Sequence, residues 1–197
     1  MKKIKLLMIL ISAIVFTAVA FAGPNEDLLN AALRNNLAGV QNALSRGANV
    51  NSVDQIGRTA LMIAAQNNDI AITKILVNSR ANVNARTNFG DTALMFAAEA
   101  GSLEILRILI NSRADINVRN YQGCPCPVHE DSSRAIAGNT ALIFAADGAK
   151  IEAVKILINA GADVNIRNSA GQTALFWATT RREQAIINLL NQAGARV

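Results

Sequence analysis

The residues with the most evident chemistry gather between positions 124 and 138, which hold both cysteines, the single histidine and two of the three prolines. Thiolates and imidazoles bind soft metals such as Zn²⁺ or Cu(I), and Cys124, Cys126 and His129 could supply three such ligands, with a neighbouring carboxylate as a fourth. Structural zinc sites instead use spacers of about two to four residues within a cysteine pair, together with a second ligand pair elsewhere. The spacing therefore disfavours a metal site.

A disulfide is the other chemistry open to the same two cysteines, because disulfides form in proteins that leave the cytosol. A bridge from Cys124 to Cys126 would close a very small ring, so we expect it to be strained and easily reduced. Pairing between two chains and free thiols are the alternatives. The segment is otherwise an elongated loop, either without a role of its own or in contact with a partner.

No other residues form a recognisable catalytic constellation. The chain has one histidine, no glycine-rich phosphate loop between a strand and a helix, and no carboxylate pair in an active-site motif. Acidic residues such as Asp54 and Asp91 occupy repeated positions, where helix capping and turn formation explain them. We therefore expect a protein without enzymatic activity and without a cofactor.

These residues must be positioned by a repeated unit. The tetrapeptide Thr-Ala-Leu-x recurs at intervals of 33, 48 and 33 residues, beginning at Thr59, Thr92, Thr140 and Thr173. A second marker, Ala-Asn/Asp-Val/Ile-Asn, recurs at intervals of 33, 33 and 48 residues, ending at Asn51, Asn84, Asn117 and Asn165. Both series indicate a 33-residue unit with one insertion of 15 residues, which we assign to positions 124–138.

One unit shows what each copy forms. Small and apolar residues over 92–98 predict a short helix that Asp91 or Thr92 caps, and Gly101 permits the turn that follows. Apolar residues over 103–110 predict a second helix, and residues 84–90 predict a projecting turn. One helix pair cannot bury its apolar face alone, so the copies must stack. We predict an all-α solenoid of helix–turn–helix units with projecting β-turn or hairpin loops.

At these residues the chain resembles the ankyrin repeat family. The matching residues are Asp54-x-x-Gly57-x-Thr59-Ala-Leu, Ala64-Ala65 and the closing Gly161-Ala-Asp-Val-Asn165. The resemblance covers residues 23–197, with one cap at each end, in units of about 25–53, 54–86, 87–119, 120–167 and 168–197.

The chain departs from the family pattern at two positions. Apolar residues replace the usual histidine near the start of the first helix, namely Met62, Met95, Ile143 and Phe176. Arg80 and Arg113 replace the usual glycine after the second helix. If that position has a left-handed backbone, each arginine costs about 1 kcal/mol. The recurring aromatic residues, Phe96, Phe144 and Trp177, together with Phe176, predict core packing.

The resemblance implies a protein-binding module without catalysis, whose contacts lie on the turn tips and the inner-helix surface. The turn positions that match the family's contacts are Gln55, Ile56, Arg58, Asn88, Phe89, Asp91, Tyr121, Gln122, Ser169 and Gln172. The matching inner-helix positions are Gln66, Asn67, Glu99, Ala100, Asp147, Thr180 and Arg181. Among these, aromatic side chains in a rigid turn make good anchors, so we expect Phe89 and Tyr121 to be exposed contacts. The alternative is that each of the two only packs on the neighbouring turn.

Residues 1–22 have the pattern of a secretory signal peptide. Lys2, Lys3 and Lys5 precede an uncharged apolar run, and Ala20-Phe21-Ala22 offers a cleavage site before Gly23. The alternative is an uncleaved membrane anchor, because the apolar run approaches the length that spans a bilayer. We expect cleavage after Ala22, hence an exported chain, periplasmic or secreted, that is not stably inserted in a membrane.

The charge balance argues against a nucleic-acid partner. The whole chain carries a formal net charge of +5, but three of its 19 basic residues lie in the leader while all 14 acidic residues lie beyond it. The remaining 16 basic residues leave a net charge of only +2, without a basic run longer than Arg181-Arg182. We expect a monomeric scaffold or adaptor that binds another protein. The alternatives are a redox- or metal-responsive protein acting through Cys124, Cys126 and His129, and a role in self-assembly.

Overall fold

The computed structural model describes residues 23–121 and 136–196. The leader, Gln122, Cys124, Cys126 and His129 therefore lie outside the described residues. Within the described residues the backbone forms ten helices and one isolated bridge between Val53 and Thr59. The predicted all-α class is confirmed.

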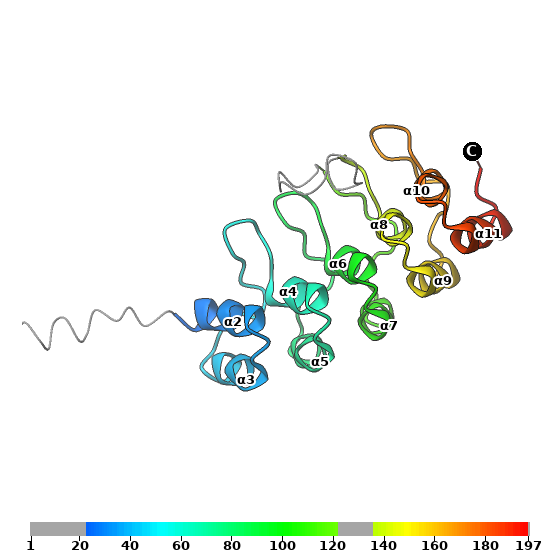
Figure 1. Cartoon of the computed structure of the whole chain (residues 1–197). Coiled ribbons are helices and arrows are strands. Elements are labelled where there is room, and N and C mark those ends of the chain that lie inside the picture. The colour runs from blue at the N-terminus through cyan, green and yellow to red at the C-terminus, as the bar shows by residue number, and fades with distance from the viewer. Residues whose placement is uncertain (1–22, 122–135, 197) are drawn as a thin grey trace, which may run out of the picture.

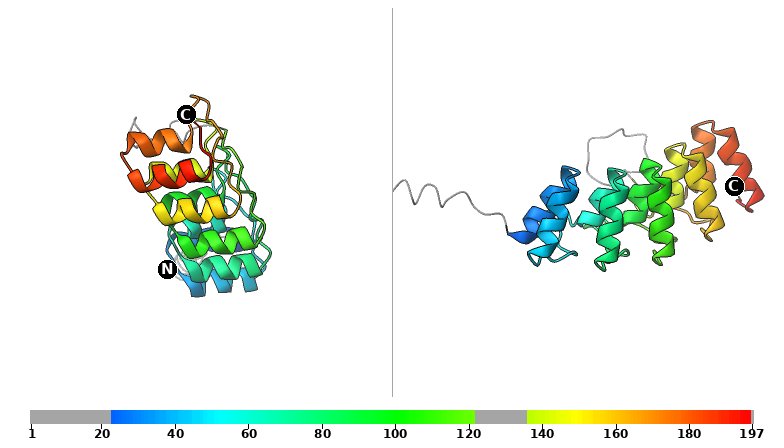
Figure 2. Two further views of the ribbon diagram at one scale, coloured as in Figure 1. Left: turned by 90° about the vertical axis from the view of Figure 1, so that its right-hand side faces the viewer. Right: turned by 90° about the horizontal axis from the view of Figure 1, so that it is seen from below.

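The ten helices form two parallel rows (Figure 1). The inner helices are α2 (Pro24–Leu33), α4 (Ala60–Gln66), α6 (Ala93–Ala100), α8 (Ala141–Asp147) and α10 (Ala174–Thr180). The outer helices are α3 (Leu37–Ser45), α5 (Ile70–Asn78), α7 (Leu103–Asn111), α9 (Ile151–Asn159) and α11 (Gln184–Gln192). Each inner helix packs on the outer helix that follows it and on the inner helices beside it, so the pairs stack side by side (Figure 2). The segments that enter α4, α6 and α10 project beyond the inner row as hairpin loops.

The repeated threonine begins four of the inner helices. Its side-chain oxygen accepts a hydrogen bond from the amide three residues later, at 3.3 to 3.4 Å, at Thr59, Thr92, Thr140 and Thr173. Of the two predicted caps of α6, Thr92 is therefore the one that the structure uses. The threonine satisfies an amide that the helix itself leaves without a partner, which explains its strict period.

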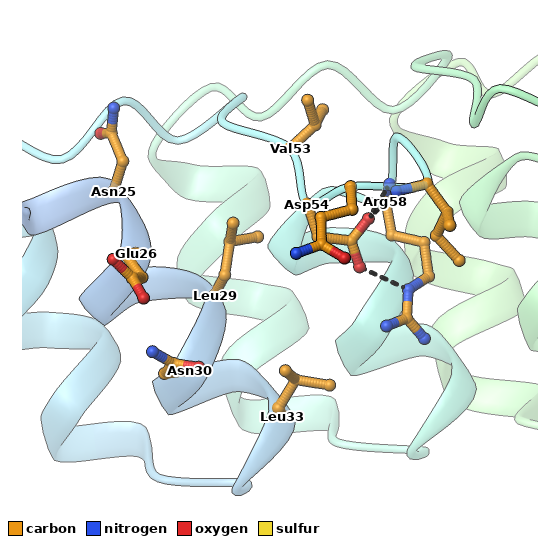
Figure 3. A pocket seen from close by; sticks show the side chains of 10 residues that line it. Asn25, Glu26, Leu29, Asn30, Leu33, Val53, Asp54 and Arg58 are labelled. Carbon is orange, nitrogen blue, oxygen red and sulfur yellow. Dashed lines mark hydrogen bonds and ion pairs between the residues drawn. The ribbon is translucent and has the colours of Figure 1, made fainter. Parts of the chain in front are cut away.

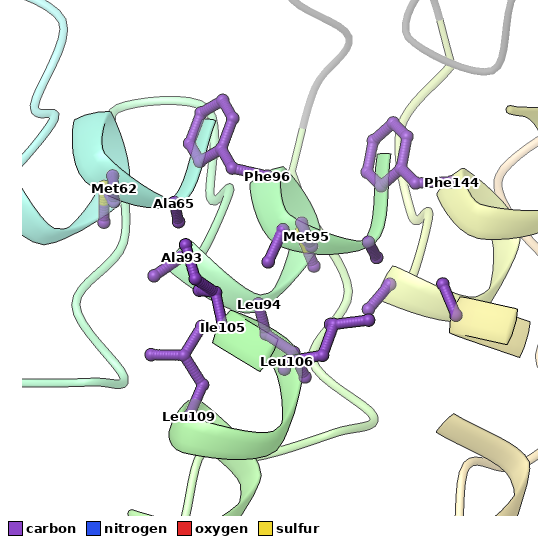
Figure 4. Close-up of a cluster of buried hydrophobic side chains, with 14 of the residues drawn as sticks. Met62, Ala65, Ala93, Leu94, Met95, Phe96, Ile105, Leu106, Leu109 and Phe144 are labelled. Atoms are coloured by element: carbon purple, nitrogen blue, oxygen red, sulfur yellow. The ribbon is translucent and has the colours of Figure 1, made fainter. Parts of the chain in front are cut away.

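The core runs the length of the stack between the two rows. Alanines of the inner helices, such as Ala97 and Ala98, are fully buried and let neighbouring units approach closely. Phe96 and Phe144 lie at equivalent places of successive units above Leu106 (Figure 4). These two aromatics, and likewise Trp177, are at most 6% exposed, which confirms the predicted core packing.

Phe176 corrects that prediction. Its side chain is 45% exposed, although the equivalent Met62, Met95 and Ile143 are buried. The unit that follows covers those three, and no unit follows α10 and α11 in the part of the chain that the structure describes. An apolar residue at this position is therefore buried only inside the stack.

The position after the outer helix has a left-handed backbone, as the glycines there indicate. The φ angle is 63° at Arg80 and 64° at Arg113, where other units have glycine. A left-handed conformation costs an L-residue roughly 1–2 kcal/mol. Ala149 and Arg182, which follow two of the inner helices, also have a left-handed backbone, with φ angles of 54° and 60°.

The asparagine that closes the second sequence marker links each unit to the next. Its side-chain oxygen accepts a hydrogen bond, at 2.7 to 2.9 Å, from a main-chain amide of the following unit. The donor amides belong to Asn82, Asp115, Asp163 and Arg196. The marker therefore repeats because it carries an inter-unit contact. None of the helices in the described part is long and apolar enough to span a bilayer.

Candidate functional site

Main-chain hydrogen bonds join the hairpin loops into one continuous row. The amide of Asn88 donates to the carbonyl of Ile56 at 3.0 Å, and that of Tyr121 donates to the carbonyl of Phe89 at 2.7 Å. Further along, the amide of Ser169 donates to the carbonyl of Ala137 at 2.9 Å. Because each loop is bonded to its neighbour, the described parts of the loops form a rigid surface that loses little entropy on binding.

The 15-residue insertion enters this row at one point. Gly138 donates its amide to the carbonyl of Asn120 at 2.9 Å, as Gly90 does to Thr87 in the preceding loop. Tyr121 bonds backward and Ala137 bonds forward, so the extra residues are 122–136 rather than the predicted 124–138. The cysteines and the histidine remain within the insertion.

The same geometry changes one predicted contact position. Ala137 accepts the hydrogen bond from the next loop, as Phe89 and Ile56 do in the earlier loops. The turn position that the sequence assigned to Gln122 is therefore taken by Ala137. Gln122 itself lies outside the described residues.

Most of the other predicted turn contacts are accessible. The exposed side chains are Gln55, Ile56, Asn88, Tyr121 and Ser169, and the half-buried ones are Arg58, Phe89 and Gln172. Of the two aromatic candidates, only Tyr121 is strongly exposed, at 64%. The inner-helix candidates are exposed or half-buried, and Arg181 forms an ion pair with Asp147 at 2.8 Å.

Asp91 is the exception, because its side chain is only 5% exposed. Its carboxylate accepts a hydrogen bond from the Asn120 side-chain amide at 3.0 Å. Asp91 therefore holds two hairpin loops together instead of facing a partner, which corrects its assignment as a contact.

This bond belongs to a buried polar chain beneath the tips that was not predicted from the sequence. The Asn120 side-chain oxygen accepts from the amide of Asn139 at 2.8 Å. The Asn139 side-chain oxygen in turn accepts from the Asn168 side chain at 3.0 Å. The asparagines at the bases of these loops were the signal that could have revealed it. This series of buried hydrogen bonds crosses the point at which residues 122–136 are inserted.

An apolar groove lies at the N-terminal end of the row, between α2 and the first hairpin loop (Figure 3). We call this the N-terminal groove; it has a volume of about 530 Å³ and is lined by Asn25, Glu26, Leu29, Asn30, Leu33, Val53, Asp54, Gln55, Ile56 and Arg58. Leu33 and Val53 are 47% and 54% exposed, and Ile56 is 39% exposed. Three large apolar side chains thus share one open hollow of a size typical of binding pockets. Leu33 and Val53 were not among the residues predicted from the sequence.

An ion pair fixes the loop that forms one wall of this groove. The Arg58 guanidinium contacts the Asp54 carboxylate at 2.8 Å, and the amides of Ile56 and Arg58 donate to the same carboxylate at 3.1 and 2.8 Å. Partial burial raises the pKa of Asp54, but these hydrogen bonds and the charge of Arg58 outweigh it and lower the pKa below its usual range. The turn therefore favours the ionised carboxylate.

The lowered pKa of Asp54 predicts an acid-dependent loss of stability. A depressed pKa contributes stability that is present above the unfolded aspartate value of about 4 and is lost as the pH falls through the lower folded value. We expect the melting temperature to fall on acidification from about pH 5 to about pH 2.5, and to fall less in Asp54→Asn. Circular dichroism melting curves of both proteins measure this. Identical pH dependence in the two would show that the Asp54 turn contributes nothing.

The structure describes no group of three or more metal-ligating side chains within residues 23–121 and 136–196. The predicted ligands and disulfide partners, Cys124, Cys126 and His129, lie outside that part. What the described residues offer is an extended surface: the N-terminal groove, the row of tips and the inner-helix face beside them.

Comparison with known protein families gives one match. A family model described as ankyrin repeats, in three copies, matches residues 28–120 and again residues 122–197. No curated protein matches the chain.

Proposed function

Because the chain belongs to the ankyrin repeat family, a general protein–protein interaction module, we propose that it is an exported, non-catalytic scaffold or adaptor. In this proposal it binds a partner protein across its hairpin tips and inner helices. The pattern of residues 1–22 supports export. The redox- or metal-responsive alternative rests on Cys124, Cys126 and His129, which lie outside the described residues.

The N-terminal groove is the observation that carries the proposal. Energetic anchors of protein interfaces are side chains that fill desolvated pockets, and the rest of the interface mainly excludes water. Leu33, Val53 and Ile56 offer such a pocket, on elements that are already ordered. A partner can therefore insert an apolar side chain without the cost of folding the site.

Substitution of the groove tests this proposal. We expect Leu33→Asp combined with Ile56→Asp to weaken partner binding at least tenfold, because carboxylates in the groove would be desolvated by an apolar anchor. Both side chains are exposed, so the fold should persist. Partners would be cross-linked to the chain in the exporting cell, identified by mass spectrometry, and their affinities measured by calorimetry.

Phe176→Asp is the matched control, since Phe176 is similarly exposed but lies at the other end of the stack. It should leave the affinity unchanged. An equal loss of binding in the control, or full binding by the groove variant, would contradict the proposed role of the groove.

A further inference from the structure

A row of arginines runs along the hairpin loops beside the tips. Arg86, Arg119 and Arg167 each precede the tip of their own loop, and they occupy the same position of three successive units. We call them the arginine row. The Arg86 guanidinium donates to the carbonyl of Arg119, and the Arg119 guanidinium donates to the carbonyl of Arg167 at 2.9 Å. The side chains of Arg86 and Arg119 therefore lie along the stack, each bridging to the next loop. Arg167 donates to the carbonyl of Gly171 in its own loop at 3.0 Å.

Tyr121 holds the first of these arginines in place. The Arg86 guanidinium carbon lies 4.1 Å from the centre of the Tyr121 ring, which is a cation–π contact. The Arg86 Nε atom is buried and has no hydrogen-bond partner. Arg86 and Arg119 line, with Tyr121 and Ser169, a hollow of about 540 Å³. None of the described residues that line it is acidic.

The partners of Arg86 and Arg119 set them apart from other arginines of the chain. Arg46, Arg58 and Arg181 each form an ion pair with a carboxylate within the protein. The hydrogen bonds of Arg86 and Arg119 go instead to neutral carbonyl groups. These bonds orient the guanidinium groups without neutralising their charge, so donors of fixed geometry are presented to an anion.

Among the residues that the structure describes, the carboxylates of the neighbouring loops do not take that place. Asp91 is buried and bonds Asn120. The carboxylate of Asp115 accepts the amide of Asn117, and that of Asp163 accepts the amide of Asn165, at 3.0 and 2.9 Å.

The same repeat position is apolar in the first hairpin loop. Val53 stands there, and its side chain lines the N-terminal groove. The surface thus changes along the stack from an apolar hollow to a row of positive charge. A ligand that runs along the loops from the N-terminal end of the stack therefore contacts the apolar hollow first and the arginines next.

We propose that the arginine row binds an acidic segment of a partner protein, whose carboxylates pair with Arg86 and Arg119 while an apolar side chain beside them fills the N-terminal groove. This inference rests on the proposed protein-binding function and specifies the partner's chemistry. Carboxylates fit better than a nucleic-acid backbone, because the chain beyond the leader is nearly neutral and the row is short.

Peptide selection tests the proposal. A random library of dodecapeptides would be selected on protein purified after expression of the full chain, and in parallel on Arg86→Gln/Arg119→Gln. The matched control is Arg34→Gln/Arg107→Gln, which removes the same charge from exposed positions elsewhere. We expect Asp and Glu beside an apolar residue to be enriched on the wild type and on the control. The selected peptide should bind the row variant at least tenfold more weakly, and increasing salt should weaken its binding to the wild type.

A peptide with glutamine in place of its acidic residues tests the same charges on the unaltered protein, so the proposal does not depend on the variant's folding. It should also bind at least tenfold more weakly. Enriched peptides without acidic residues would overturn the arginine-row proposal and leave the protein-binding function standing. A complete lack of enrichment would count against both. Tighter binding of a twenty-nucleotide oligothymidine than of the acidic peptide would assign the row to phosphate and overturn the proposal.

Discussion

Replacing Asn120 with alanine is expected to lower the free energy of unfolding by about 3 kcal/mol. The Asn120 side chain donates to the Asp91 carboxylate and accepts from the Asn139 amide, at 3.0 and 2.8 Å. All three residues are at most 5% exposed, so water cannot replace either bond. Each buried polar group that loses its partner costs roughly 1–3 kcal/mol, and the substitution breaks two such bonds together.

Urea unfolding measures this prediction, followed by circular dichroism and by the fluorescence of Trp177, the only tryptophan. The matched control is Asn88→Ala in the preceding loop, where the side chain is exposed and its amide donates to the Gln55 carbonyl at 3.3 Å. We expect a change of about 0.5 kcal/mol or less there. Equal destabilisation in the two variants would mean that the buried polar chain is no more important than a surface contact.

A second consequence concerns the surface. Asn120 lies between Arg119 and Tyr121, and its backbone closes the turn through Asn139 and Gly138. Loss of its side-chain bonds should loosen the place where the chain enters and leaves residues 122–136. Acidic-peptide binding should therefore weaken in Asn120→Ala.

The repeated parts of the fold could be predicted where a repeated residue performs a local task. Thr92 caps a helix through its own side chain, and Arg113 occupies a left-handed position that its glycine equivalents mark. Such tasks depend only on residues that are close by in the sequence, so the sequence alone is enough to assign them. Because the sequence repeats, the structure predicted for one unit applied to the other units as well.

The boundary of the insertion could not be placed from the sequence, because two glycines match the turn position of this loop equally well. Gly123 follows Tyr121 and Gln122 with the spacing that Gly90 has in the preceding loop. The structure uses Gly138, because the residue after it, Asn139, bonds Asn120 across the insertion. That contact joins residues 19 positions apart, and the repeat pattern carries no signal for it.

The residues of the candidate surface were predicted from their positions in the repeat. The prediction was wrong where the repeat position does not determine whether a side chain is exposed. Asp91 matched a contact position, but its side chain is buried and accepts a hydrogen bond from Asn120 of the next loop. Leu33 and Val53 went unnoticed because the first unit lacks the regular pattern, so its apolar residues could not be assigned to a face. The three arginines recur at a constant position of the sequence, but the sequence does not show that Arg86 and Arg119 bond to neutral carbonyl groups.

Two turn glycines allow the energetic effect of the contact between loops to be distinguished from the effect of the turn conformation. Gly90 and Gly171 occupy the same turn position and have φ angles of 82° and 76°. A Cβ atom at Gly171 would meet nothing within 4 Å, whereas one at Gly90 would lie 2.8 Å from the amide nitrogen of Tyr121. Alanine at either position has the cost of a left-handed backbone, roughly 1–2 kcal/mol. Only at Gly90 must the next loop also move.

Gly90→Ala should therefore lower the free energy of unfolding by about 3 kcal/mol, against about 1 kcal/mol for Gly171→Ala, because it also strains the bond from Tyr121 to the Phe89 carbonyl. The same displacement should move Tyr121 away from Arg86, so the acidic peptide should bind Gly90→Ala more weakly and Gly171→Ala as it binds the wild type. Urea unfolding and calorimetric titration measure the two effects. Equal stability losses would mean that the loops are not held by their mutual bonds, since a Cβ atom at Gly90 would meet Tyr121 and Arg86, whereas one at Gly171 would meet nothing within 4 Å.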